Sequence, residues 1–135
     1  MQKQLAQVAT FQRAFGQNVE TQPTLINKET AKLRYDLMKE ENEEYLEAVE
    51  NNDLVEVLDA LTDQLYILCG TILEHGMQNI IEKCFEEVNR SNMSKLDEVG
   101  LAIINGENGV FDPTRPLGKV LKSYNYSPPN LKQFL

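Results

Sequence analysis

The feature that most constrains the fold is an apolar stripe in the middle of the chain. Between residues 54 and 74, aliphatic side chains recur three or four positions apart, at Leu54, Leu58, Leu61, Leu65, Leu68 and Ile72. An α-helix turns once in about 3.6 residues, so this spacing places the side chains on one helix face. The stripe therefore predicts a helix from about Leu54 to Glu74, which ends at His75-Gly76.

Three other segments also carry helical patterns. A helix from about Lys3 to Phe15 is expected to stop at Gly16, with inward residues Leu5, Val8, Ala9 and Phe15. A second helix, from about Lys28 to Glu50, has Asn27 as its N-cap. A further helix is expected from about Met77 to Asn89, with a core face of Ile80, Ile81, Cys84, Phe85 and Val88.

The chain changes character after Lys95, where glycines and prolines become frequent. Ile103-Ile104 and Val110-Phe111 flank two Asn-Gly turn signals and can pair as a short hairpin. We expect an all-α fold: a bundle of four to five helices with an irregular C-terminal tail. The whole chain, residues 1–135, is interpreted as one domain, with a helical core over about 3–95 and the tail over about 96–135.

Composition excludes several classes of function. A formal net charge of −8 does not favour nucleic acid or an anionic membrane as partner unless the surface carries a local basic patch. The N-terminal residues do not form a signal peptide, and no apolar run approaches the roughly 20 residues of a membrane span, so a cytoplasmic protein is expected. Cys69 and Cys84 lie in apolar helical contexts and are interpreted as free thiols.

Acidic residues are concentrated on the predicted helix 28–50. Counted from Leu33, both Glu41 and Glu44 fall within the sector of about 80° that holds its apolar residues. A carboxylate directed toward a core is costly unless another group pairs with it. Glu40 lies at the edge of this sector.

A second acidic group follows on the predicted helix 54–74. Glu56, Asp59 and Asp63 span about 60° of arc and face away from the apolar stripe. They can form a solvated surface, since acids near a helix N-terminus are favoured by the dipole. The alternative is a site for a hard divalent cation such as Mg²⁺, because no Lys or Arg matches these acids and Mg²⁺ prefers oxygen ligands.

A third group follows the last predicted helix. Arg90, Ser91, Asn92 and Lys95 supply cationic, hydroxyl and amide groups suited to phosphate oxygens. A polar helix end, with its cations near the C-terminal dipole, is the simpler interpretation of the same residues.

These groups together resemble a known superfamily. The segment Glu40-Glu41-x-x-Glu44-x-x-Glu47-Ala48 resembles the E-E-x-x-E-x-x-E-A segment of the all-α nucleoside triphosphate pyrophosphohydrolases, which include MazG proteins and phosphoribosyl-ATP pyrophosphohydrolase. Residues 59–70 look like their second acidic helix. Residues 90–95, with Gly118-Lys119 and Tyr126-x-Pro128-Pro129, resemble a MazG-like subgroup. The resemblance covers about residues 28 to 131.

The resemblance implies a hydrolase that cleaves a nucleoside triphosphate between its α and β phosphates, giving a nucleoside monophosphate and pyrophosphate. It implies Mg²⁺, with Mn²⁺ as a substitute, held by Glu41, Glu44, Asp59 and Asp63. Glu56 is the next candidate ligand, because the superfamily's E-x-x-D spacing fits Glu56 and Asp59 while the following apolar run aligns with Asp63. This choice stays open.

The remaining roles follow from the same resemblance. Glu40 would position or deprotonate the attacking water, and Lys95 with its neighbours at 90–92 would hold phosphate oxygens. Relatives assemble as dimers or tetramers, so a homodimer or homotetramer is expected. Two alternatives are a helical interaction protein without catalysis and a protein of the same fold that binds a nucleotide but hydrolyses it poorly.

Overall fold

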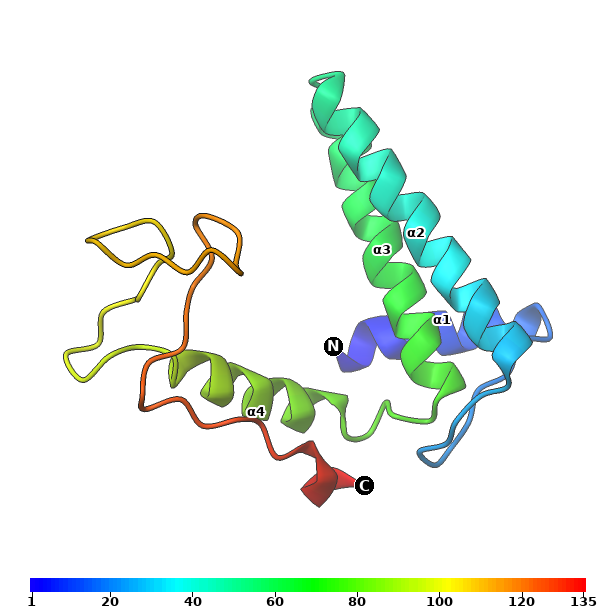
Figure 1. Cartoon of the computed structure of the whole chain (residues 1–135). Coiled ribbons are helices and arrows are strands. Elements are labelled where there is room, and N and C mark those ends of the chain that lie inside the picture. Colours follow the sequence, from blue (N-terminus) through cyan, green and yellow to red (C-terminus); the bar gives the residue numbers. More distant parts are fainter. The chain divides into compact units, whose positions relative to one another are not determined.

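The computed structural model describes all 135 residues, and its named secondary-structure elements are all helices. Four α-helices are followed by one short 3₁₀ helix (Figure 1): α1 (Gln2–Ala14), α2 (Lys28–Glu50), α3 (Leu54–Glu74), α4 (Ile81–Met93) and η1 (Leu131–Phe134). No strand is formed, so the all-α class expected from the sequence is confirmed. None of the helices combines the length and the apolar character that crossing a membrane requires.

The chain forms two compact units, Met1–Ile81 and Glu82–Leu135. The first holds α1, α2 and α3. The second holds nearly all of α4 together with the tail, so the division falls well before the core boundary expected near residue 95. The interpretation of residues 1–135 as one domain stays a prediction.

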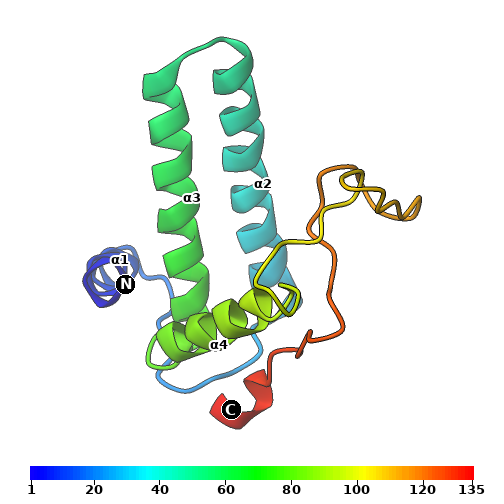
Figure 2. The same ribbon diagram turned by 90° about the vertical axis from the view of Figure 1, so that its left-hand side faces the viewer.

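In the first unit, α2 and α3 form a long antiparallel hairpin (Figures 1 and 2). Both helices begin where a side chain caps free backbone amides. The Asn27 Oδ1 accepts from the Thr30 amide at 2.8 Å, and the Asp53 Oδ1 accepts from the Val55 amide at 3.0 Å. Asn52 takes the left-handed backbone conformation, with φ of 55°, in the short link. The predicted bounds of both helices are confirmed.

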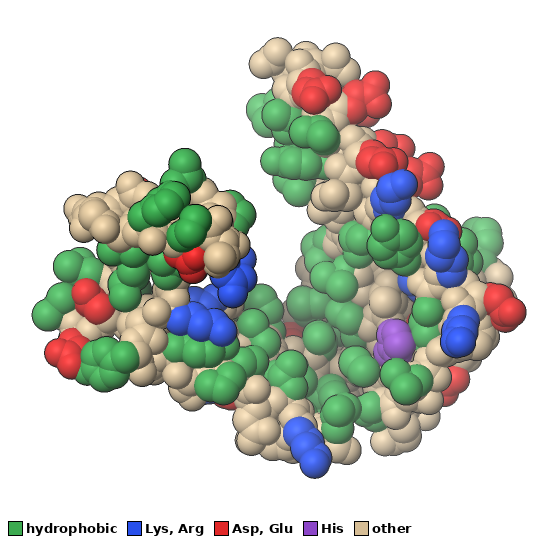
Figure 3. Space-filling view, in the orientation of Figure 1, with side chains coloured by type: hydrophobic (Ala, Val, Ile, Leu, Met, Phe, Trp, Pro, Cys, Tyr) green, Lys and Arg blue, Asp and Glu red, His purple; other side chains and the backbone are tan.

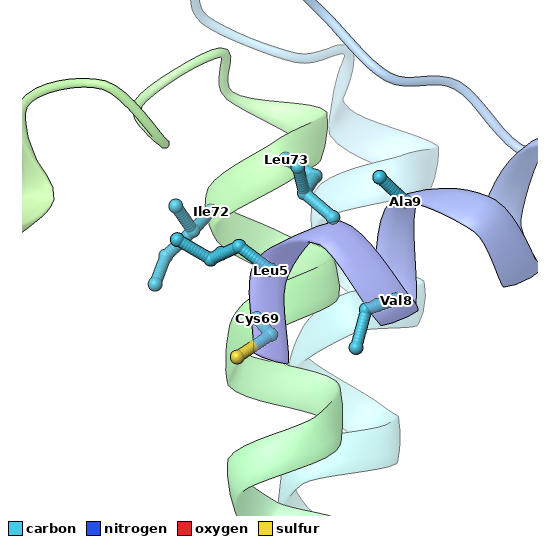
Figure 4. Packing of buried hydrophobic residues seen from close by; sticks show 6 residues of the cluster. All are labelled: Leu5, Val8, Ala9, Cys69, Ile72 and Leu73. Atoms are coloured by element: carbon cyan, nitrogen blue, oxygen red, sulfur yellow. The ribbon is translucent and has the colours of Figure 1, made fainter. Parts of the chain in front are cut away.

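α1 packs across the base of this hairpin. Its residues Leu5, Val8 and Ala9 meet α3 in the apolar core (Figure 4), where the α3 residues are Cys69, Ile72 and Leu73. Phe15, expected to face inward, is 69% exposed. It follows the last residue of α1, and its ring stacks against Phe11 with centroids 4.4 Å apart.

α3 packs against α2 through a different face from the one that carries its leucine residues. The residues of α3 that are covered beside α2 include Ala60, which is buried, and Val57, Gln64 and Ile67, which are half-buried. The leucine stripe, defined as Leu54, Leu58, Leu61, Leu65 and Leu68, is 43–79% exposed. The single chain therefore leaves a row of large apolar side chains uncovered.

The second unit differs more from the prediction. α4 begins at Ile81, later than expected, because residues after the left-handed Gly76 (φ 67°) form a turn in which the Ile80 amide donates to the Met77 carbonyl at 3.1 Å. Phe85 is 69% exposed rather than part of a core. Both free cysteines are confirmed, with Cys69 buried and Cys84 half-buried.

The expected hairpin of the tail is wrong in its pairing. Ile104 forms an antiparallel bridge with Val120, not with the segment at Val110-Phe111. Instead, residues 104–110 close a tight turn in which the Gly106 amide donates to the Val110 carbonyl at 2.8 Å. The Asn-Gly signals thus mark turns, as predicted, but the segment that pairs lies further along the chain.

Candidate active site

One flank of the α2–α3 hairpin is acidic. Near the link between the two helices, a cavity of about 340 Å³ is lined by Glu44, Glu47, Ala48, Asn51, Asp53, Glu56, Asp59 and Ala60. Figure 3 shows Asp and Glu side chains along one edge of the hairpin toward its tip and hydrophobic side chains along the other edge. The sequence prediction that the acids of α3 face away from the leucine stripe agrees with this arrangement.

Glu41 is the most constrained of the acids. Its side chain is half-buried, and its Oε2 atom is buried without a hydrogen-bond partner. Burial is the largest cause that raises the pKa of Glu41 above the usual value for glutamate, and the neighbouring carboxylates raise it further: Glu44, Asp63, Glu40 and Asp59, in decreasing order. The Gln64 amide donates to the Glu41 main-chain oxygen at 3.3 Å and joins the two helices at this level.

The predicted carboxylates thus fall into two overlapping groups. Glu40, Glu44, Asp59 and Asp63 act on Glu41 through their charge, whereas Glu44, Glu56 and Asp59 line the cavity. Glu44 and Asp59 belong to both groups. The sequence left two candidate ligand pairs on α3: Glu56 with Asp59, and Asp59 with Asp63. Asp59 belongs to both pairs, so both interpretations require it.

No basic side chain neutralises this cluster. The ion pairs of α2 involve other acids: Lys32 pairs with Asp36, and the Lys39 Nζ lies 3.4 Å from a Glu43 oxygen. At the same time, no group of three Asp, Glu, His or Cys side chains is positioned to hold a metal ion. The carboxylates are therefore close enough to affect one another through their charges, but they are not arranged as a complete set of metal ligands.

Two residues of the hairpin were not predicted from the sequence, and one of them lies at the site. Glu47 lines the cavity, and its place in the acidic motif was the available signal. Arg34 is 8% exposed and begins the covered face of α2, where Leu33 was expected; Leu33 is 54% exposed. The Arg34 Nε donates to the Thr71 Oγ1 at 3.0 Å and its Nη2 to the Ile67 carbonyl at 2.5 Å.

Arg34 joins α2 to α3 and does not reach the acidic cavity. Its guanidinium lies over Gly70, where an added Cβ would approach the Nη2 atom to 2.4 Å. Burial lowers the pKa of Arg34, and Glu74 partly offsets the effect. The glycine inside the predicted helix was the one sequence signal for this buried cation.

The predicted phosphate-binding residues lie in the second unit. The Arg90 guanidinium donates to both Glu87 oxygens at 2.8 Å and to the Pro128 carbonyl at 3.2 Å. Ser91 is 3% exposed, and the Lys95 Nζ donates to the Asn92 Oδ1 at 2.7 Å. Arg90 and Ser91 are thus engaged within the unit, whereas Lys95 lines a cavity of the tail. Their role in phosphate binding stays a prediction.

The all-helical fold agrees with the all-α nucleoside triphosphate pyrophosphohydrolases, the MazG-like superfamily. Residues 8–92 match the phosphoribosyl-ATP pyrophosphohydrolase family, and the chain belongs to this family. Membership supports a nucleotide pyrophosphohydrolase activity in general.

One similar protein is an uncharacterized protein of Acanthamoeba polyphaga mimivirus. It is 45% identical to this chain over 67 residues, which are 47% of this chain and 27% of the relative. The matched segment thus spans about a quarter of the relative's length.

Proposed function

We propose that the chain is a Mg²⁺-dependent nucleoside triphosphate pyrophosphohydrolase that cleaves between the α and β phosphates. Water supplies an oxygen to one of the two phosphorus atoms, the bridging P–O bond breaks, and a nucleoside monophosphate and pyrophosphate leave. The observation that carries the proposal is the buried, unpartnered Oε2 of Glu41 within a group of carboxylates that no Lys or Arg neutralises.

The residues fit a hard divalent cation. An unpartnered buried carboxylate oxygen is costly, and a cation offsets both its desolvation and the repulsion from neighbouring acids. Glu41, Glu44, Asp59 and Asp63 would hold Mg²⁺, with Glu56 as the alternative on α3 and Mn²⁺ as a substitute ion. When bound, the ion neutralises the phosphate oxygens and orients them for displacement.

The protein side chains then supply proton transfer and substrate placement. Glu40 is exposed, adjacent to Glu41, and close enough to raise the pKa of Glu41 through its charge. This position suits a carboxylate that orients the attacking water or accepts its proton. Lys95, with Arg90, Ser91 and Asn92, is proposed to hold phosphate oxygens.

The leucine stripe supports self-association. Its residues alternate four and three positions apart along α3, the spacing of the seam in helical bundles, and each is 43% exposed or more. An isologous contact would place the stripes of two copies against each other and leave both acidic flanks free. We propose a homodimer, or a homotetramer built from such dimers.

A panel of nucleoside triphosphates, with phosphoribosyl-ATP included, tests the activity. Each compound is incubated with the protein and Mg²⁺ or Mn²⁺, and pyrophosphate is measured. Release that Glu44→Ala abolishes and Glu43→Ala preserves supports the proposal, because Glu43 lies on the same helix but pairs with Lys39. Nucleotide binding without release would indicate a sensor, and neither binding nor release would indicate an interaction protein.

A further inference from the structure

The tail contains a second cavity, of about 470 Å³, that is basic. It is lined by Lys95, Asp112, Arg115, Lys119, Val120, Leu121 and Lys122. We call the four cations among these residues, Lys95, Arg115, Lys119 and Lys122, the basic pocket. Lys and Arg side chains lie beside one another on the lobe that the second unit forms (Figure 3). All four residues lie outside the segment 8–92 that matches the family.

None of these four cations forms an ion pair, although the chain carries a net charge of −8 and the carboxylate of Asp112 lies in the same lining. Lys95 donates to the Asn92 amide oxygen, and the Lys122 Nζ lies 4.2 Å from the centre of the Tyr126 ring. Both of these partners are uncharged. The side chains of Arg115 and Lys119 take part in no hydrogen bond or ion pair. Four like charges gathered around one cavity repel one another, and an anion in the cavity would relieve that repulsion.

The one acid in the lining is already engaged. The Asp112 Oδ1 accepts from the Thr114 amide at 2.9 Å and from the Thr114 hydroxyl at 2.6 Å. These hydrogen bonds are the main cause that lowers the pKa of Asp112, and Arg115 adds to the effect. Asp112 therefore shapes a turn of the tail, and it leaves the basic pocket with a clear excess of positive charge.

Hydrogen bonds from one buried side chain hold the main chain around the pocket in place. Asn105 is 1% exposed, and its Nδ2 donates to the carbonyls of Asp112 at 2.9 Å, Arg115 at 2.8 Å and Pro116 at 3.1 Å. Its Oδ1 accepts from the Asp112 amide at 2.7 Å. The Asn105 amide in turn donates to the Lys119 carbonyl at 2.9 Å. One buried side chain thus fixes the segment that carries Arg115 and Lys119.

A second set of contacts brings Lys95 to the same place. The Ser123 amide donates to the Lys95 carbonyl at 3.2 Å, and the Ser123 hydroxyl donates to the Leu96 carbonyl at 2.7 Å. Ser123 is 8% exposed. The residues after α4 are therefore held beside the segment that ends at Ser123, so that cations from two separate segments, Lys95 and residues 115–122, line one cavity.

We propose that the basic pocket binds an anion with several linked phosphates, of the class of pyrophosphate and triphosphate. Lysine and arginine side chains are the usual ligands of phosphate oxygens. A cavity of this volume is in the range of small-molecule sites, and all four cations line it. The acidic remainder of the protein repels a long polyanion, which disfavours nucleic acid.

The test titrates the full chain with inorganic triphosphate in EDTA and follows the heat of binding. EDTA removes divalent ions, so the acidic cluster of the hairpin repels the probe and hydrolysis does not occur. Triphosphate is expected to bind more tightly than orthophosphate, with an affinity that falls as salt is added. The double variant Arg115→Gln/Lys119→Gln should weaken binding about tenfold or more.

The matched control is Lys83→Gln/Lys132→Gln, which removes the same charge from the same unit but outside the pocket, and it should bind as the parent does. Lys119→Arg keeps the charge and should retain binding. Triphosphate binding no better than orthophosphate binding, or equal weakening by both double variants, overturns the proposal. Glu44→Ala should bind triphosphate in EDTA normally, so a failure of the proposed hydrolysis is distinguishable from a failure of the pocket.

Discussion

The helical hairpin and the tail obtain their shapes in different ways. In the hairpin, the regular helical backbone determines the direction of each side chain. The functional groups therefore lie at the positions that the helical period gives them. In the tail, a few buried polar side chains, above all Asn105, determine where the backbone goes. The hairpin is therefore robust to a change of one functional side chain, whereas one substitution in the tail can displace a whole set of residues.

The two regions also differ in what they leave unsatisfied. The hairpin carries unneutralised carboxylates on one flank and uncovered leucines on the other, and the tail carries unneutralised cations. Each deficit indicates a different missing partner: a cation, an apolar surface and an anion. Substitutions can test these three assignments separately.

The largest effect is expected at Asp59, which belongs to both acidic groups. Asp59→Asn should lower pyrophosphate release by a factor on the order of 10³, because it removes a charge that the cation needs. Glu56→Gln and Asp63→Asn then show which of these two acids is the second ligand on α3. The variant that removes a ligand should lower pyrophosphate release nearly as much as Asp59→Asn does. The other variant should release pyrophosphate within a few-fold of the parent. Equal, small effects of all three variants would contradict a metal site on α3.

Glu40→Gln should separate catalysis from metal binding. The change removes a proton acceptor but leaves the proposed ligands in place, so turnover should fall by a factor on the order of 10². The affinity for Mg²⁺, measured by calorimetry, should change little. Turnover equal to that of the parent would remove Glu40 from the role of base.

The leucine stripe should control assembly without touching the acidic flank. Leu61→Glu places a charge in the middle of the stripe and should weaken self-association by about 10²-fold or more, measured by sedimentation or light scattering at micromolar concentration. Leu25→Glu is the control, because Leu25 is 91% exposed and lies outside the stripe. A parent protein that is monomeric at this concentration would contradict the proposed interface.

Asn105→Ala should loosen the tail and leave the hairpin intact. The substitution removes the donor of three part-buried hydrogen bonds, and a buried carbonyl that loses its partner costs about 1–3 kcal/mol. Amide hydrogen exchange should accelerate at Leu121, whose amide donates to the Ile103 carbonyl at 2.7 Å, and stay unchanged in α2 and α3. Asn125→Ala, an exposed position in the tail, should change neither.

The same contrast explains which parts of the structure could be predicted. The starting points of α2 and α3 follow from Asn27 and Asp53, local N-caps that act within three residues. Counting helical turns predicts the inward position of Glu41, but the same count placed Glu44 inward, and Glu44 is exposed. Arg34 could not be anticipated in the same way, because its burial depends on the space above Gly70, a residue on the other helix.

The tail was less predictable because its decisive contacts are not local. Asn105 was interpreted as part of a turn signal, and it does precede a turn, but its side chain binds residues up to 11 positions further along. Pairing of Ile104 with Val120 is a consequence of that contact, and no short-range propensity indicates it. Likewise, the period of the leucine stripe predicts a helix but does not reveal whether the same chain covers it.

The smallest effect is expected from the pH dependence of stability at Glu41. Its pKa in the folded protein is raised, so the charged form is less favourable there than in the unfolded chain. The resulting loss of stability is absent below the ordinary glutamate pKa of about 4.3 and develops as the pH rises through the higher folded value. In EDTA at neutral pH, Glu41→Gln should therefore raise the melting temperature by a few degrees, and the difference should vanish near pH 4. Added Mg²⁺ should reverse the order by stabilising the parent alone. Glu43→Gln, which removes a pair with Lys39, should show neither the gain nor the reversal, and a gain there of the same size would assign the effect to net charge rather than to the site.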